Sequence, residues 1–256
     1  MATGVFERVV VGVDGSEESR EAVRQAVRLL TPGGTLRLVT AVEVGKAAGA
    51  GFAATRAAGQ LAAEATAALE AAKQLAPSAQ TTLVKGGVAA ALRTAIERER
   101  ATLVCLGSHG RGRLAGMMVG HVVAGLLHDA PCAVLVARPA RVPEAFPRLV
   151  VAGLDGSPAA VAAGAAAAEL AERLGATVRH VLATGGKGVD LDAARAETAD
   201  VEIDERSPVD ALVAAAEDAD LLVVGSRGLH GVRALGSVSE RVAHRAPCSV
   251  LVVRPA

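Results

Sequence analysis

Aromatic residues and cysteines are scarce in this sequence. The 256 residues include no Trp and no Tyr, and aromatic residues make up 1% of the chain, so a hydrophobic core must be built from Ala, Val and Leu. The three cysteines, Cys105, Cys132 and Cys248, form no C-x-x-C pair, and each lies in or beside an apolar run. We therefore expect buried, reduced thiols in a cytoplasmic protein, with no disulfide framework and no zinc site.

The sequence also lacks an excess of charge and a long hydrophobic run. Lys plus Arg and Asp plus Glu both number 27, and a formal net charge of +0 gives no electrostatic basis for binding nucleic acid or an anionic membrane. Residues 1–8 contain no apolar signal core, and the Ala-rich stretch 159–171 is too short to span a bilayer. We expect a soluble protein with neither nucleic acid nor membrane as a partner.

What the sequence does contain is a repeat. Val-Asp-Gly-Ser at 13–16 returns as Leu-Asp-Gly-Ser at 154–157, the run 103–110 returns at 221–228, and 130–139 returns at 246–255. The offset between copies shrinks from 141 (155 − 14) to 118 (225 − 107) and then to 116 (248 − 132). Three matches in the same order indicate a tandem duplication, and the first reduction predicts that the second copy has lost about one helix.

The alternation of elements predicts two α/β domains, at 1–140 and 147–256, joined by a proline-rich linker. Ser16 is the expected N-cap of the first helix, with Glu17 and Glu18 in its first turn, and Ser157-Pro158 begins the matching helix of the second copy. Strands alternating with helices imply parallel pairing and right-handed crossovers. In the first copy we expect strands at 8–13, 35–42, 81–84, 102–106 and 132–137, and helices from Ser16 to about Leu30 and at 55–76, 88–99 and 121–129. In the second copy the second and third strands are expected at about 176–183 and 200–204, without a full crossover helix between them.

A glycine-rich segment, 107–120, follows the expected strand 102–106 and precedes the helix 121–129. Glycines let the backbone approach a ligand closely, and the unpaired N–H groups of a helix start favour phosphate. Arg111 and Arg113 add positive charge to this segment. The segment matches neither the Walker pattern nor the dinucleotide fingerprint.

Taken together, these motifs resemble the universal stress protein family over both copies. They are Val-Asp-Gly-Ser after the first strand, Gly-x2-Gly-x9-Gly after the fourth, and Ala-Pro-Cys-x-Val-Leu-Val-x-Arg at the end. The resemblance implies a Rossmann-like fold of the adenine nucleotide alpha hydrolase type, with five-stranded, mostly parallel sheets of order 3-2-1-4-5. It also implies pairing through the last strands and, in many members, a site for ATP or AMP, with or without magnesium.

The resemblance assigns candidate ligand-binding residues in both copies. The first copy keeps the full glycine spacing, but His121 replaces the hydroxyl residue that ends the motif. The second copy has seven residues, not nine, between Gly228 and Gly236. We therefore expect the first copy to be the main site. The candidates are Gly12, Val13, Asp14, Ala41, Gly107, Gly110, Arg111, Gly120, His121 and Val122 in the first copy, and Asp155, Ala183, Gly225, Gly228, Gly236 and Ser237 in the second.

Structural interpretations of several candidates stay open. Asp14 and Asp155 also suit Asp-Gly turns, and Ser237 with Glu240 forms a capping box. His109 is expected to be a solvated loop residue. Protonated, His121 would attract phosphate and make binding pH-dependent; neutral, it would fill the space and exclude phosphate.

These features predict a stress-response protein that binds an adenine nucleotide for regulation. The two copies are expected to form an intramolecular pseudo-dimer in which strands 132–138 and 248–254 lie side by side, since each copy otherwise exposes an apolar sheet edge. A further homodimer is compatible with this arrangement. Two alternatives are a slow ATP hydrolase and a nucleotide-free interaction protein with relic motifs. The sequence shows no nucleophile–base pair and no magnesium carboxylate cluster, so no catalytic or metal-ligating residue is assigned.

Overall fold

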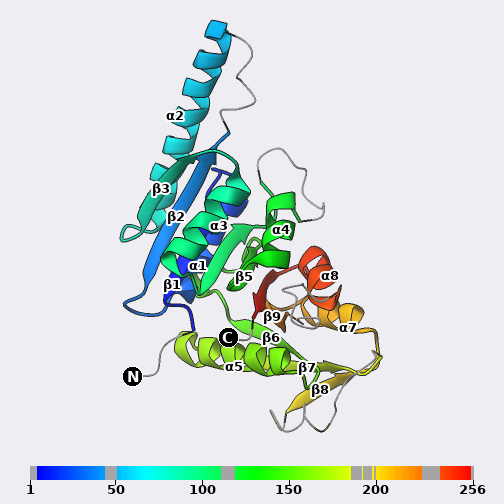
Figure 1. The fold of residues 1–256 in the computed structure, drawn as a ribbon. Helices are drawn as coiled ribbons and strands as arrows, with labels where there is room; N and C mark the ends of the chain where they lie inside the picture. Colours follow the sequence, from blue (N-terminus) through cyan, green and yellow to red (C-terminus); the bar gives the residue numbers. More distant parts are fainter. Residues whose placement is uncertain are drawn as a thin grey trace. The chain divides into compact units, whose positions relative to one another are not determined.

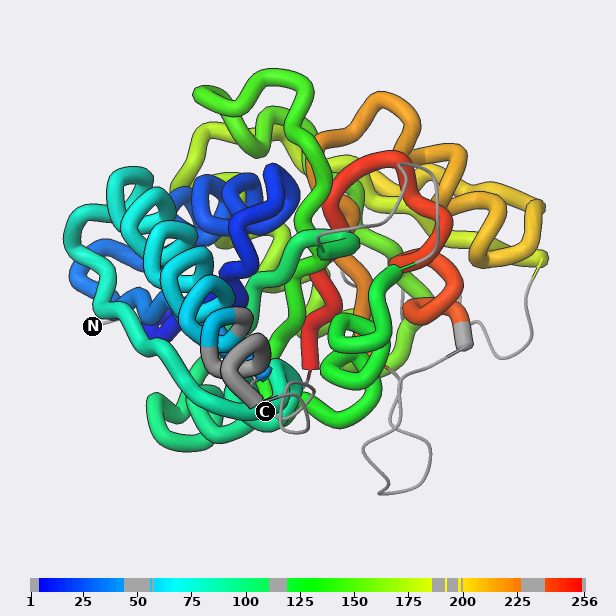
Figure 2. The backbone as a smooth tube through the Cα atoms, turned by 90° about the horizontal axis from the view of Figure 1, so that it is seen from above, coloured from blue at the N-terminus to red at the C-terminus, as the bar shows by residue number. Residues whose placement is uncertain are grey.

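The computed structural model describes residues 5–43, 51–110, 119–185, 192, 198, 200–226 and 237–254. The chain divides into two compact units, residues 1–123 and 124–256. Figure 1 labels their helices and strands, and Figure 2 follows the backbone from above, with the first unit running from blue to green and the second from green to red.

The first unit contains a parallel sheet of four strands in the order β3-β2-β1-β4. Its strands are nearly continuous in apolar residues where they are buried on both faces, as in β1 and β4. Helix α4 crosses the boundary between the units. The elements are β1 (Arg8–Gly12), α1 (Glu17–Leu29), β2 (Thr35–Val42), α2 (Gly51–Leu75), β3 (Gln80–Lys85), α3 (Val88–Glu99), β4 (Leu103–Gly107) and α4 (His121–Asp129).

Helix α1 begins and ends where the sequence predicts. The Ser16 side chain caps the helix by accepting a hydrogen bond from the Ser19 N–H at 3.1 Å, and Glu17 and Glu18 occupy the first turn. At the other end, Leu30 leaves the helical conformation. This cap fixes the start of α1 directly after the carboxyl end of β1.

Helices cover both faces of the first sheet. A Cβ atom on Gly12 would meet Leu92 of α3 at 3.5 Å, whereas one on Gly107 would meet the Glu18 carbonyl carbon of α1 at 2.7 Å. Val11 is aligned with Cys105, and Gly12 is one residue beyond the first whereas Gly107 is two beyond the second, so these two glycines point to opposite faces. Helix α2 packs against α1 as well as β2 and β3, and its far end continues beyond the strands (Figure 1).

The second unit contains the strands of the second copy together with the last strand of the first. Its order is β5-β10-β9-β6-β7-β8, in which only β5 and β10 are antiparallel. The elements are β5 (Ala133–Ala137), the short 3-10 helix η2 (Pro143–Ala145), β6 (Leu149–Leu154), α5 (Pro158–Leu174), β7 (Thr177–Ala183), β8 (Val201–Asp204), α7 (Pro208–Ala215), β9 (Leu221–Gly225), α8 (Ser237–Arg245) and β10 (Ser249–Val253).

The pairing of β5 with β10 confirms that the two terminal strands lie side by side. Val134 is aligned with Val252, and both side chains are fully buried. Beyond each strand an arginine caps a helix of the other copy: Arg138 Nη2 donates to the Ala243 carbonyl of α8 at 2.6 Å, and Arg254 Nη2 donates to the Leu127 carbonyl of α4 at 2.5 Å. The repeated Arg-Pro motif therefore satisfies carbonyls at two helix ends.

The predicted sheet order is found complete in the second copy, where β8-β7-β6-β9-β10 is 3-2-1-4-5. The first four strands of the first copy have the order β3-β2-β1-β4, which is 3-2-1-4, and all four lie in the first unit. Most predicted elements agree with the structure to within two residues, while α2 begins at Gly51 rather than at residue 55.

The proposed domain boundaries at residues 140 and 147 remain a prediction about the repeat, since the two compact units divide before β5. The connection we expected to be trimmed, 184–198, lies mostly outside the described residues.

All three cysteines are buried, and none of them forms a disulfide. Burial raises the pKa of the Cys248 thiol to about 12, so this thiol stays protonated and unreactive. Within the described ranges, no helix combines the length and apolar character needed to cross a bilayer.

Candidate functional site

A cavity of about 560 Å³ opens at the carboxyl ends of β1, β2 and β4 in the first unit. Strands β2 and β4 lie on opposite sides of β1. The carboxyl ends of these strands therefore form the topological switch point of the sheet, which is where open α/β folds bind ligands. The residues that line it are Gly12, Val13, Asp14, Ser16, Ser19, Thr40, Ala41, Val42, Glu43, Leu61, Glu64, Ala65, Val88, Leu92, Leu106, Gly107, His109, Gly110, Gly120, His121, Val122 and Val123.

The structure brings nine of the ten first-copy candidates to this one cavity. The tenth, Arg111, lies outside the described residues, as does Arg113. The nine are Gly12, Val13, Asp14, Ala41, Gly107, Gly110, Gly120, His121 and Val122.

Asp14 stands at the end of β1 and has two roles. Its Oδ1 accepts hydrogen bonds from the Ser16 N–H at 2.9 Å and the Ser16 hydroxyl at 2.5 Å, which shape the turn before α1. Its Oδ2 points toward Gly110, where a Cβ atom would lie 2.5 Å from it. The turn interpretation and the site interpretation therefore both apply to Asp14, one to each carboxylate oxygen.

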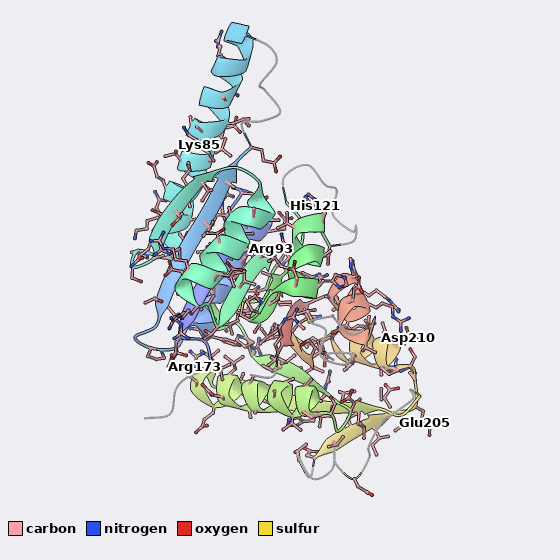
Figure 3. The ribbon with its side chains drawn as sticks, in the orientation of Figure 1. Lys85, Arg93, His121, Arg173, Glu205 and Asp210 are labelled. Carbon is pink, nitrogen blue, oxygen red and sulfur yellow. The ribbon has the colours of Figure 1, made fainter. Side chains whose placement is uncertain are left out.

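The two ends of the glycine segment are held together. The Gly120 N–H donates to the Ser108 carbonyl at 3.1 Å. His121 is the first residue of α4, with an exposed side chain at the cavity rim, and Figure 3 labels it at this first turn. Close-packed glycines beside a helix start provide the kind of backbone that holds phosphate groups.

His109 differs from our expectation of a solvated loop residue. Its side chain is only 14% exposed; Nε2 lies 3.5 Å from Glu18 Oε1 and Nδ1 lies 2.9 Å from the Ser108 hydroxyl. No motif indicates this pairing, because Glu18 is distant from His109 in the chain. Folding of α1 against β4 brings the two side chains together.

The opposite wall of the cavity consists of residues that the sequence did not single out. Helix α2 contributes Leu61, Glu64 and Ala65, which share one helical face, and α3 contributes Val88 and Leu92. Leu61 is 45% exposed, so a large apolar side chain stands at the lip of the cavity. The expected helix at 55–76 does not by itself show which of its residues border a cavity.

The second-copy candidates are described only in part. Asp155 Oδ1 accepts from the Ser157 N–H at 2.9 Å, which repeats the turn at Asp14. Gly225 packs so closely on α5 that a Cβ atom would lie 2.4 Å from the Ala159 carbonyl carbon, and Ala183 is buried at the end of β7. Gly228 and Gly236 lie outside the described residues, and Ser237 is described only as the first residue of α8.

The donor set of the cavity suits an organic ligand with a phosphate end. The lining combines glycine backbone and the start of α4 with apolar side chains such as Leu61, Val88 and Leu92. Among the described residues, no group of three or more His, Cys, Asp or Glu side chains is placed to hold a metal ion.

Comparison with known proteins identifies the family. The model of the Universal stress protein family matches residues 6–138 and 187–254, which is most of the chain. The chain belongs to the universal stress protein family. A family member from Mycolicibacterium smegmatis is 31% identical, over 96% of this chain and 97% of its own length. One from Mycobacterium tuberculosis is 34% identical over 60% of this chain, and the match spans 62% of that relative's length.

Solved universal stress proteins share the fold. The protein from Archaeoglobus fulgidus superposes with a TM-score of 0.75 at 21% identity, covering 98% of this chain and 99% of its own. A putative universal stress protein from Pseudomonas aeruginosa superposes with a TM-score of 0.71 at 17% identity, covering 98% and 94%. At these identities the likeness concerns the fold and not the ligand.

Proposed function

We propose that this universal stress protein binds an adenine nucleotide, ATP or AMP, in the first-copy cavity, and that binding is regulatory. The observation that carries the proposal is the cavity itself: nine residues assigned from the family resemblance line one space of about 560 Å³. This volume lies within the range of about 300–1,000 Å³ that small-ligand pockets occupy.

The polarity of the cavity orients the ligand. The phosphates would lie over Gly107, Gly110 and Gly120, against the start of α4. The base would lie between Leu61 on α2 and Leu92 on α3, in the apolar part of the cavity. Asp14 would then face the ribose and the first phosphate.

The serine–histidine contact beside the cavity is not placed to act directly on a bound nucleotide. Ser108 and His109 are in hydrogen-bonding distance, a contact that the sequence analysis did not foresee. The Ser108 side chain is 3% exposed and does not line the cavity, so it is not placed to attack a ligand there. The cavity also favours a binding protein over an interaction protein with relic motifs, because the motif residues still line one open space.

We further propose that the pairing of β5 with β10 makes the two copies an intramolecular pseudo-dimer, compatible with a further homodimer. We expect the protein to act in the cytoplasm.

The test is direct measurement of the ligand. Purified protein is denatured and released nucleotide is identified by chromatography; the stripped protein is then titrated calorimetrically with ATP and AMP, with and without magnesium. We expect saturable binding of at least one nucleotide. Failure of all titrations would favour the interaction protein, and steady release of phosphate from ATP would favour the hydrolase.

A further inference from the structure

His109 is a cavity-lining imidazole held on both sides. One ring nitrogen lies 2.9 Å from the Ser108 hydroxyl and the other 3.5 Å from the Glu18 carboxylate, which is itself 27% exposed. A histidine beside a carboxylate can affect the binding of an anion, because the net charge of the pair depends on whether the imidazole is protonated.

The backbone around this pair is tightly constrained. Gly107 packs on Glu18 so closely that a Cβ atom would lie 2.7 Å from the Glu18 carbonyl carbon. The Gly120 N–H closes the glycine segment by donating to the Ser108 carbonyl. The backbone of Glu18 is therefore close to Gly107, and the backbone next to His109 is tied to Gly120.

The net charge of the Glu18–His109 pair affects the charge that an anionic ligand meets in the cavity. When the imidazole is neutral, the pair carries one negative charge; when it is protonated, the pair is neutral. Asp14 adds a further carboxylate beside Gly110. The other charged or titratable residues that line the described cavity are His121 at the start of α4 and Glu43 and Glu64 on the opposite wall. Arg111 and Arg113 lie outside the described residues. Among the described lining residues, Asp14, Glu43 and Glu64 are carboxylates, so protonation of the pair reduces the repulsion that an anionic ligand meets there.

The repeat gives independent support for a cation at this position. The second copy carries Arg227 in the place of His109 and Ala159 in the place of Glu18. At these two positions the second copy therefore has an arginine and an alanine in sequence, where the first copy has a histidine and a glutamate.

We propose that the Glu18–His109 pair recognises the negative charge of the ligand's phosphate, and that the pair takes up a proton when the phosphorylated ligand binds. This inference rests on the proposed function and goes beyond it by assigning a charge-sensing role to two residues.

The test uses two probes whose own charge does not change with pH. Adenosine 5′-(methyl phosphate) is a phosphodiester with one fixed negative charge, and adenosine is uncharged. Dissociation constants are measured calorimetrically at pH values of about 5.5 and about 8.5, on either side of the ordinary imidazole value. We expect the charged probe to bind about tenfold more tightly at the lower pH, the factor that a coupling of one pKa unit produces. Adenosine should bind equally at both.

Variants separate a charge role from a structural one. His109→Asn should remove the pH dependence of the charged probe. Glu18→Gln should tighten its binding at the higher pH several-fold, because a negative charge is lost, whereas mere damage to the loop would weaken both probes. Glu17→Gln is the matched control, since Glu17 lies in the same helical turn but is 60% exposed and paired with Arg20 and Arg24.

Three outcomes would overturn the proposal: no pH dependence for the charged probe, a dependence that persists in His109→Asn, or one that disappears in His121→Ser instead. A protein that binds adenosine but shows any of these results loses only the charge-sensing assignment. A protein that binds neither probe at either pH overturns the proposed function and this inference together.

Discussion

A Cβ atom on Gly110 would lie 2.5 Å from Asp14 Oδ2. Gly110 therefore packs closely on the Asp14 carboxylate, at the point where the end of β1 and the glycine segment both border the cavity. Because the other oxygen of Asp14 is held by Ser16, the carboxylate cannot turn away without breaking the turn before α1.

Gly110→Ala should therefore weaken nucleotide binding about tenfold, or ~1.4 kcal/mol, by displacing the Asp14 carboxylate into the space of the ligand. The measurement is calorimetric titration with ATP or AMP. Gly59→Ala is the matched control, because a Cβ atom there meets nothing within 4 Å. That control should leave affinity unchanged and stabilise the interior of α2 by roughly 0.5–1 kcal/mol. Unchanged affinity in Gly110→Ala would remove Asp14 and Gly110 from the site.

Val134→Asp should destabilise the second unit by several kcal/mol or prevent folding. Val134 is 0% exposed and aligned with Val252, so the variant buries an unpaired charge or must neutralise it. Val161→Asp on the exposed side of α5 serves as a control and should change stability by no more than about 0.5 kcal/mol. Denaturant unfolding compares the two, and equal midpoints would contradict the buried junction of β5 with β10.

Arg138→Lys should cost about 1.5–3 kcal/mol of stability, the range for hydrogen bonds to charged groups. The planar guanidinium donates to the carbonyls of both Ala243 and Cys248, at 2.6 and 3.2 Å, and a single ammonium does not reproduce that fork. Burial lowers the pKa of Arg138, which reflects how far this cation is removed from water. Arg98→Lys, with a side chain 73% exposed, should have no measurable effect in the same unfolding experiment.

The stability of the protein should fall as the pH is lowered through the ordinary range of histidine, in part because of His180. Burial lowers the pKa of His180 in the folded chain, and the nearby Asp200 opposes this only partly. Between the folded and unfolded values the unfolded chain binds more protons, so acid favours unfolding. The difference in unfolding free energy between the parent and His180→Gln should therefore shift in favour of the variant between about pH 7 and about pH 5. A constant difference would show that His180 titrates alike in both states.

The fold followed from features that act locally along the chain. Apolar runs, Ser16 and Ser157 as caps, and prolines after helices set the elements, because propensity and capping depend on neighbouring residues. The repeat then indicated two copies of one topology. The strand order itself came from the family resemblance, and the parallel crossovers of the structure agree with it.

The site was predicted only where a motif marks it. Gly107, Gly110 and Asp14 belong to short motifs, so their meeting could be expected from the order of the strands. Leu61, Glu64 and the Glu18–His109 pair carry no motif. Their positions depend on how α1 and α2 pack against the sheet.

The sequence by itself therefore determined the elements, the duplication and the glycine segment, since each depends on residues close together in the chain. Only the tertiary structure decided that α2 walls the cavity, that His109 is paired rather than solvated, and that Arg138 and Arg254 cap helices of opposite copies. The reason is physical: contacts between side chains distant in sequence depend on the packing of whole helices and strands, and local propensity does not encode that packing.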